Sequence, residues 1–270
     1  MADVSPDLPA YLARIGHAGP ARADLPTLEA LALLHPAAIA FENLDAMVGR
    51  APSLALPDLE AKLVRGGRGG WCFEQNLLLA AMLQALGFAV RHVAARVMVG
   101  RPPDAPPGPR SHMALIVETP DGPRLIDVGF GGRTPTAPLA LTDAVQATPH
   151  EPMRLVPLGE AWRLEVLVGA EWQPLYRFDL AETLPVDHEA PNWYLATHPA
   201  SHFRVRPVAA RPLPDGRRLS LAGRRFTVRT GAREEAYVLA DNERVGMCLH
   251  EEFGLILPAD AATWDALGRE

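Results

Sequence analysis

The chain of 270 residues has only two cysteines, one lysine and no long hydrophobic run. Cys72 and Cys248 lie 176 residues apart, a separation that matches no zinc or redox motif. No window approaches the ~18 apolar residues of a membrane span, and the N-terminus lacks the basic and apolar segments of a secretory signal. These absences favour a cytoplasmic protein with free thiols, no metal and no membrane partner.

Charge is also limited and unevenly distributed. The net charge of −6 argues against a general nucleic-acid binder. Lys62 accompanies 25 arginines, a bias that a GC-rich genome explains as well as function does. Residues 201–233 hold nine arginines against one acid, Asp215. A solvated strand face and a patch for an anionic ligand such as a nucleotide phosphate both account for this cluster.

The length exceeds the ~100–150 residues typical of one domain, so two or three packed units are expected. Residues 1–87 have helical patterns, with a break predicted at His35-Pro36. Residues 88–187 contain short β-type runs separated by turns, as in a meander or small barrel. Residues 188–270 combine helical segments with a hairpin. The sequence therefore predicts an α+β protein with a helical part, a β part and a mixed C-terminal part.

The stretch RGGRGGWCFEQN, residues 65–76, places four glycines and two arginines before Cys72. The helix-forming run that follows ends at Gly87, so Cys72 is predicted at a helix N-terminus. A free thiol titrates near pH ~8.5, and the positive potential of a helix start, together with Arg68, favours its thiolate. A buried structural cysteine is the alternative. Gly-Gly-Trp-Cys at a helix start favours a nucleophile.

A cysteine nucleophile needs a histidine base and a group that orients it. His112 opens the predicted strand HMALIV, and Asp127 lies in the run LIDVGFGG. A turn at residues 119–122 makes these two runs a hairpin, and pairing Thr119 with Gly122 makes Asp127 a diagonal neighbour of His112. A one-residue slip would turn Asp127 to the other face, so the register decides this interpretation.

These motifs, in this order, resemble the arylamine N-acetyltransferases. The resemblance rests on three motifs: RGGWCFEQN, HMALIV and IDVGFGG. It extends over most of the chain through five further matches: FENLD (41–45), YLARIG (11–16), PLYRFDL (174–180), NWYLATHPASHF (192–203) and LHEEFGLIL (249–257). The resemblance implies a helical bundle (1–87), a β-barrel (88–187) and a C-terminal α/β lid (188–270). The first two parts would form a papain-like cysteine catalytic core.

The resemblance also implies a reaction. A triad of Cys72, His112 and Asp127 would transfer acetyl from acetyl-CoA to an arylamine or arylhydrazine by a ping-pong mechanism through acetyl-Cys72. Arg68 and Glu42 would form a structural ion pair. It also implies that the acceptor pocket is lined by Phe130, Phe41 and Phe203. The implied CoA contacts are Gly131, Gly132, Thr134 and Arg204, and the arginine-rich stretch would lie near the CoA phosphates.

Other functions remain open at this stage. A related amide synthase would use the same triad to transfer a longer acyl chain to an aryl amine. Papain-like proteases and transglutaminases share the triad, but GGWCFEQN lacks the protease signature. A binding module with an inert Cys72 is the non-enzymatic alternative. His198 and His202 are separated by Pro199 and have no third partner, so a metal site is disfavoured. The oligomeric state and the physiological amine stay open.

Overall fold

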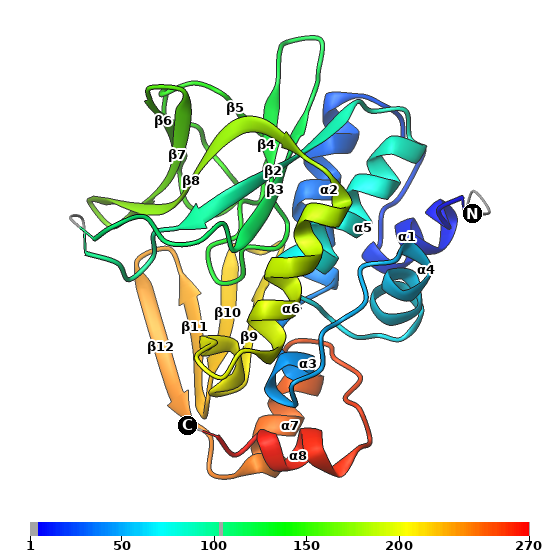
Figure 1. Cartoon of the computed structure of the whole chain (residues 1–270), viewed down its shortest axis with the longest axis vertical. Coiled ribbons are helices and arrows are strands. Elements are labelled where there is room, and N and C mark those ends of the chain that lie inside the picture. Colours follow the sequence, from blue (N-terminus) through cyan, green and yellow to red (C-terminus); the bar gives the residue numbers. More distant parts are fainter. Residues whose placement is uncertain (1–4, 103–104, 270) are drawn as a thin grey trace.

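The computed structural model describes residues 5–102 and 105–269 of the chain. Figure 1 shows three parts: helices from the N-terminal third, a β-barrel beside them, and a smaller sheet with the C-terminal helices below. The predicted α+β class with these three parts is confirmed. Within the described ranges, no helix has the length and apolar character needed to cross a membrane.

The N-terminal helices pack around one buried core. Asp24 caps the helix α2 (Leu25–Ala38), since its carboxylate accepts a hydrogen bond from the Thr27 N–H at 2.9 Å. The break predicted at His35-Pro36 is wrong, because α2 continues to Ala38 and the Ile39 N–H donates to the His35 carbonyl at 2.8 Å. Proline removes one donor near the helix end, and burial of this last turn holds the helix together. The other elements of this part are α1 (Leu8–Ile15), β1 (Phe41–Glu42), α3 (Leu44–Met47), α4 (Leu56–Leu59) and the π-helix η1 (Glu60–Arg65).

The predicted helix is confirmed as α5 (Cys72–Ala85), and Cys72 is its first residue. Gly87 has a φ of +95°, a left-handed conformation that suits glycine just beyond the C-cap, Leu86. At the other end, the Glu74 carboxylate accepts a hydrogen bond from the Trp71 N–H at 3.1 Å. Both ends of the helix that carries the thiol are therefore defined by specific contacts.

Seven strands form the barrel, in the order β5-β4-β3-β2-β8-β7-β6. In the β3–β4 hairpin, Leu115 pairs with Ile126 and Val117 with Arg124, which is the predicted register. Gln146 pairs with Met153 and its side chain bonds both backbone groups of Ala140, so the two edge strands nearly meet. The strands are β2 (Val90–Val97), β3 (His112–Val117), β4 (Arg124–Ile126), β5 (Leu139–Ala140), β6 (Met153–Leu158), β7 (Ala161–Val168) and β8 (Glu171–Thr183).

The second sheet has the order β1-β9-β10-β11-β12, so a strand of the N-terminal part forms its edge. Phe41 pairs with Ala210 and Glu42 with Ala209. This pairing joins the N-terminal part directly to the C-terminal one, and the domain boundaries at 87/88 and 187/188 stay a prediction. The C-terminal elements are η2 (Pro185–His188), α6 (Glu189–Thr197), η3 (His202–Arg204), β9 (Val208–Pro212), β10 (Arg217–Ala222), β11 (Arg225–Thr230), β12 (Arg233–Val238), α7 (Asn242–Glu251) and α8 (Ala261–Ala266).

Candidate active site

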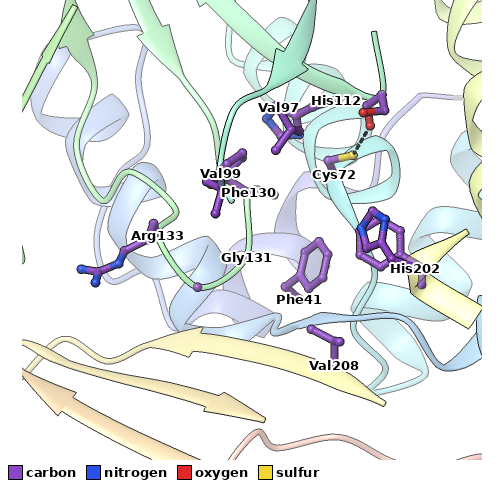
Figure 2. Close-up of a pocket in the computed structure, with 14 residues that line it drawn as sticks. Phe41, Cys72, Val97, Val99, His112, Phe130, Gly131, Arg133, His202 and Val208 are labelled. Carbon is purple, nitrogen blue, oxygen red and sulfur yellow. Dashed lines mark hydrogen bonds between the residues drawn. The ribbon is translucent and has the colours of Figure 1, made fainter. Parts of the chain in front are cut away.

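The Cys72 thiol lies at the first turn of α5, with 6% of the residue exposed. Its Sγ makes a long 4.0 Å contact with the carbonyl oxygen of Ser111, the residue before β3 (Figure 2). The loop after β4 approaches the helix so closely that a Cβ on Gly129 would lie 2.6 Å from the Cys72 Cα. Glycine at this position therefore lets the barrel come against the start of the helix.

His112 and Asp127 form a buried pair beside the thiol. His112 Nε2 and Asp127 Oδ2 lie 2.7 Å apart, and both residues are at most 3% exposed. Asp127 Oδ1 accepts two more hydrogen bonds, from Asn76 Nδ2 and from the Gly129 N–H, each at 2.9 Å. The hairpin register and the helix α5 thus bring Cys72, His112 and Asp127 together.

The charges of the pair stabilise each other. Burial alone lowers the pKa of His112, but the Asp127 carboxylate and hydrogen bonds to Asp127 and Cys72 outweigh it and raise this pKa to about 10. Burial acts to raise the pKa of Asp127, and His112 with the Asn76 and Gly129 donors brings it below its ordinary value. The arrangement favours an imidazolium next to an ionised carboxylate.

Two neighbours of the pair were missed from the sequence. Asn76 lies one helical turn after Cys72, and its Oδ1 also accepts the Val128 N–H at 3.0 Å, so it holds the segment directly after β4 that carries Asp127. The Tyr176 ring packs against His112 with 4.9 Å between the ring centroids. The i, i+4 spacing from Cys72 could have indicated Asn76, whereas Tyr176 comes from β8 and only the barrel places it there.

A mostly apolar cavity of about 370 Å³ opens from the thiol (Figure 2). It lies where α5, the barrel and the C-terminal sheet meet, and Phe41 and Phe203 contact each other in its wall with 6.0 Å between ring centroids. The lining side chains other than Cys72 and His112 are Phe41, Val97, Val99, Ser111, Phe130, Arg133, His202, Phe203 and Val208. A flat aromatic molecule matches this lining in size and polarity.

The residues predicted to contact CoA divide into two groups. Gly131 and Gly132 line the cavity. Thr134 lies outside this lining, where its carbonyl accepts a hydrogen bond from Arg218 at 3.0 Å. Arg204 also lies outside it and donates to the Thr197 carbonyl at 2.9 Å.

The arginines of residues 201–233 do not line the cavity either, although His202, Phe203 and Val208 of the same stretch do. Several of them bind acids of the chain itself: Arg218 lies 2.7 Å from Glu151, and Arg229 lies 2.6 Å from Glu234. Glu151 and Glu234 each pair with a second arginine as well, Arg133 and Arg225, so both clusters keep a net positive charge. The patch for an anionic ligand therefore stays a prediction.

Arg68 and Glu42 lie together as an ion pair. Arg68 Nε and one terminal nitrogen lie 2.9 and 2.7 Å from the same oxygen of Glu42, whose side chain is 1% exposed. The other oxygen of Glu42 accepts the Leu44 N–H at 2.6 Å. The pair connects the loop before α5 to the strand β1.

In residues 5–102 and 105–269, no three histidine, cysteine, aspartate or glutamate side chains are grouped to hold a metal ion. His198 instead stacks on Tyr194, with 4.4 Å between ring centroids, and His202 contacts Phe203 at 4.1 Å. Both histidines therefore make packing contacts.

A family model described as N-acetyltransferase matches residues 24–262, which places the chain in that class of protein. The arylamine N-acetyltransferase of Escherichia coli K12 is 42% identical over 254 residues, covering 93% of this chain and 90% of the relative. The corresponding protein of Mycobacterium tuberculosis H37Rv is 42% identical over 253 residues, covering 92% and 89%. The chain belongs to the arylamine N-acetyltransferase family.

Solved structures of this family superpose on the whole fold. The Mycobacterium tuberculosis enzyme matches with a TM-score of 0.93 and 40% identity, covering 98% of this chain and all of the other. The Mycobacterium marinum enzyme in complex with CoA matches with a TM-score of 0.89 and 41% identity, covering 92% and 93%. The predicted papain-like architecture in three parts is thereby confirmed.

Proposed function

We propose that this protein transfers the acetyl group of acetyl-CoA to the nitrogen of an arylamine or arylhydrazine, through an acetyl-Cys72 intermediate. The observation that carries this proposal is the buried Cys72 thiol, beside the His112–Asp127 pair, at the end of an apolar cavity. Membership of the arylamine N-acetyltransferase family supports the same reaction.

In the first half-reaction, the Cys72 proton passes to His112, and the thiolate attacks the thioester carbonyl carbon of acetyl-CoA. The tetrahedral intermediate collapses with cleavage of the carbon–sulfur bond to CoA. His112 returns the proton to the departing CoA sulfur, leaving acetyl-Cys72. The first backbone N–H groups of α5 have no partners within the helix, so they are available to stabilise the oxyanion.

In the second half-reaction, the amine nitrogen attacks the acetyl carbon and His112 accepts the proton that the nitrogen loses. The carbon–sulfur bond to Cys72 breaks, and the thiolate is restored beside the imidazolium. Asp127 orients His112 and stabilises its charge throughout. Because the same thiol and oxyanion site serve both half-reactions, one cavity accommodates both substrates in turn.

The cavity wall suggests the remaining roles. Phe41, Phe130 and Phe203 present aromatic surfaces to the ring of the acceptor. Gly131 and Gly132 let the pantetheine arm pass close to the backbone. Arg133 and His202 are the basic side chains, apart from His112, that line the cavity and could reach the CoA phosphates, and Arg133 also lies 2.9 Å from Glu151. Thr134 and Arg204 stay predicted CoA contacts outside this lining.

The decisive experiment is intact-protein mass spectrometry after brief exposure to acetyl-CoA, with wild type and Cys72→Ala compared. We expect one added acetyl group that requires Cys72 and disappears on addition of an aromatic amine. A thiol that reacts with iodoacetamide faster than Cys248 but takes no acetyl group would indicate the amide synthase instead. A Cys72 that is inert to both reagents would refute the proposal.

A further inference from the structure

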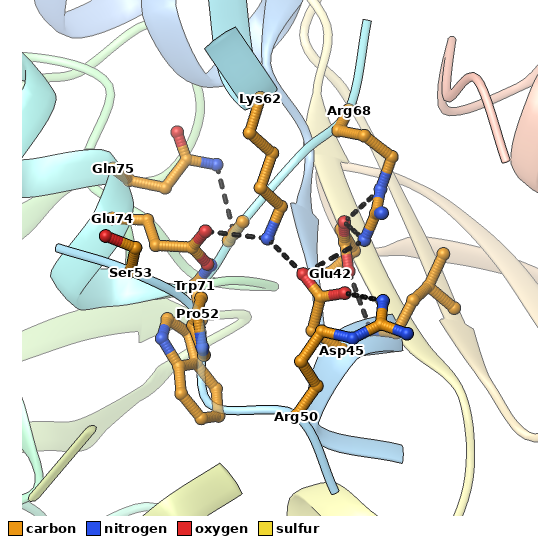
Figure 3. A network of polar contacts seen from close by, with 12 residues as sticks. Glu42, Asp45, Arg50, Pro52, Ser53, Lys62, Arg68, Trp71, Glu74 and Gln75 are labelled. Atoms are coloured by element: carbon orange, nitrogen blue, oxygen red, sulfur yellow. Dashed lines mark hydrogen bonds and ion pairs between the residues drawn. The ribbon is translucent and has the colours of Figure 1, made fainter. Parts of the chain in front are cut away.

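A chain of buried ion pairs lies beneath the start of the catalytic helix (Figure 3). Lys62 Nζ lies 2.6 Å from both Glu74 Oε1 and Asp45 Oδ2. Asp45 in turn lies 3.4 Å from Arg68, which binds Glu42. Acidic and basic groups alternate along this chain, which starts at α5 and ends at β1, the strand that carries Phe41 into the cavity.

Lys62 is the central link, and the backbone is shaped to place it there. It is the only lysine in 270 residues and lies on the π-helix η1, a wide turn found frequently at functional sites. Its carbonyl accepts the Arg68 N–H at 3.2 Å. A Cβ at Gly66 would lie 2.9 Å from that same carbonyl oxygen, so glycine is needed where this turn ends.

Glu74 connects Lys62 to the backbone next to Cys72. One carboxylate oxygen binds Lys62, and the other accepts the N–H of Trp71, the residue before Cys72. The carboxylate folds back over Gly70, where a Cβ would lie 2.7 Å from it. The first turn of α5 is therefore held through a carboxylate that contacts both the backbone next to Cys72 and the amine of Lys62.

This carboxylate depends on its cation. Glu74 is 2% exposed, and burial raises its pKa, with Lys62 opposing the rise. The void lined by Glu42, Asp45, Lys62, Trp71 and Glu74 has no room for a water molecule. Without Lys62, Glu74 would either take up a proton or remain as an unpaired negative charge in the first turn of α5, two residues after Cys72, and the latter disfavours the thiolate.

We propose that Lys62 is a positioning residue for the Cys72 nucleophile: by bridging Glu74 and Asp45, it holds Glu74 in place as the acceptor for the Trp71 N–H. The inference rests on the proposed role of Cys72. The charged groups that face Lys62 come from three segments and all belong to the same network: Glu42 and Asp45, Arg68, and Glu74.

The test measures the iodoacetamide alkylation rate of Cys72 against that of Cys248 in the same protein, together with the rate of acetylation by acetyl-CoA, as a function of pH. Lys62→Met is expected to move the acidic limb of the Cys72 alkylation profile up by about one pH unit, so that the rate on that limb falls about tenfold, and to add a pH dependence from Glu74. Lys62→Arg keeps the cation and is expected to retain most of the wild-type rate.

The double variant Lys62→Met/Glu74→Gln is expected to recover most of the rate, because a neutral amide accepts the Trp71 N–H and Asp45 keeps Arg50 and Arg68 as partners. It should also lose the added pH dependence. Arg154→Met is the control: it removes a partly exposed cation that lies 2.7 Å from the buried Glu165 in the barrel, and it should leave the alkylation profile unchanged.

The outcomes separate the two proposals. A wild-type Cys72 no faster than Cys248 would refute the proposed function itself. If the wild-type Cys72 is reactive and Lys62→Met folds with the same alkylation and acetylation profiles, the proposed role of Lys62 is refuted. If Lys62→Met does not fold, recovery of fold and reactivity in the double variant supports the inference. A double variant as impaired as the single one overturns it.

Discussion

Asp127→Asn is the change that most directly tests the buried pair beside Cys72. The amide has the same shape as the carboxylate, but its Oδ1 would keep the hydrogen bonds from Asn76 and Gly129, so its NH₂ group would face His112 Nε2. An NH₂ donor at that position requires an unprotonated Nε2. The ring proton then moves to Nδ1, and the imidazole loses the nitrogen that accepts the thiol proton.

The magnitude follows from the pKa of His112, which Asp127 and the neighbouring hydrogen bonds raise from 6.5 to about 10 against the effect of burial. At about 1.4 kcal/mol for each pH unit, this net shift corresponds to about 5 kcal/mol in favour of the imidazolium after the cost of burial. The same exchange in a serine–histidine–aspartate triad costs about 10⁴-fold. We expect the alkylation of Cys72 at pH 7 to slow by between about 10²- and 10⁴-fold.

The assay is the second-order rate of iodoacetamide alkylation across pH, resolved by peptide mass mapping. Cys248 serves as the internal reference, since burial raises the pKa of its thiol to about 12. Wild type should react at a rate that changes little through the neutral range, because the imidazolium persists there. The variant should instead accelerate with pH as a free thiol does, near pH ~8.5. Superimposable profiles would refute the reasoning.

Three further changes test the fold around the site. Gly129→Ala would place a Cβ 2.6 Å from the Cys72 Cα and push the barrel loop away from α5. The rate of acetylation should fall by about 10²-fold, the effect expected of a displacement of roughly 1 Å, and an unchanged rate would contradict the close approach. Arg68→Met leaves Glu42 buried and unpaired, so urea denaturation should show a loss of about 3–5 kcal/mol in unfolding free energy, and an unchanged midpoint would argue against the pair. Burial lowers the pKa of His35 from 6.5 to about 4, so between pH 6.5 and about 4 the imidazole binds a proton only in the unfolded chain. The unfolding free energy should therefore fall as the pH drops through this interval, by at most about 3 kcal/mol. In thermal melts, His35→Gln should reduce this pH dependence.

Local sequence was sufficient wherever neighbours along the chain determine the structure. Helix-forming residues between Trp71 and Gly87 specify α5, and the turn at 119–122 specifies the register that puts Asp127 beside His112. The same local reasoning failed at Pro36, where packing of the last turn of α2 sustains the helix despite the missing donor.

Sequence by itself thus determined the helix that carries Cys72, the hairpin that carries its partners, and the family resemblance. Only the tertiary structure placed Asn76 and Tyr176 around the pair, joined β1 to the C-terminal sheet, and turned Lys62 into the link between Glu74 and Asp45. The physical reason is that turns and helices depend on residues a few positions apart. Buried charges and cavity walls depend on side chains that meet only when distant segments pack.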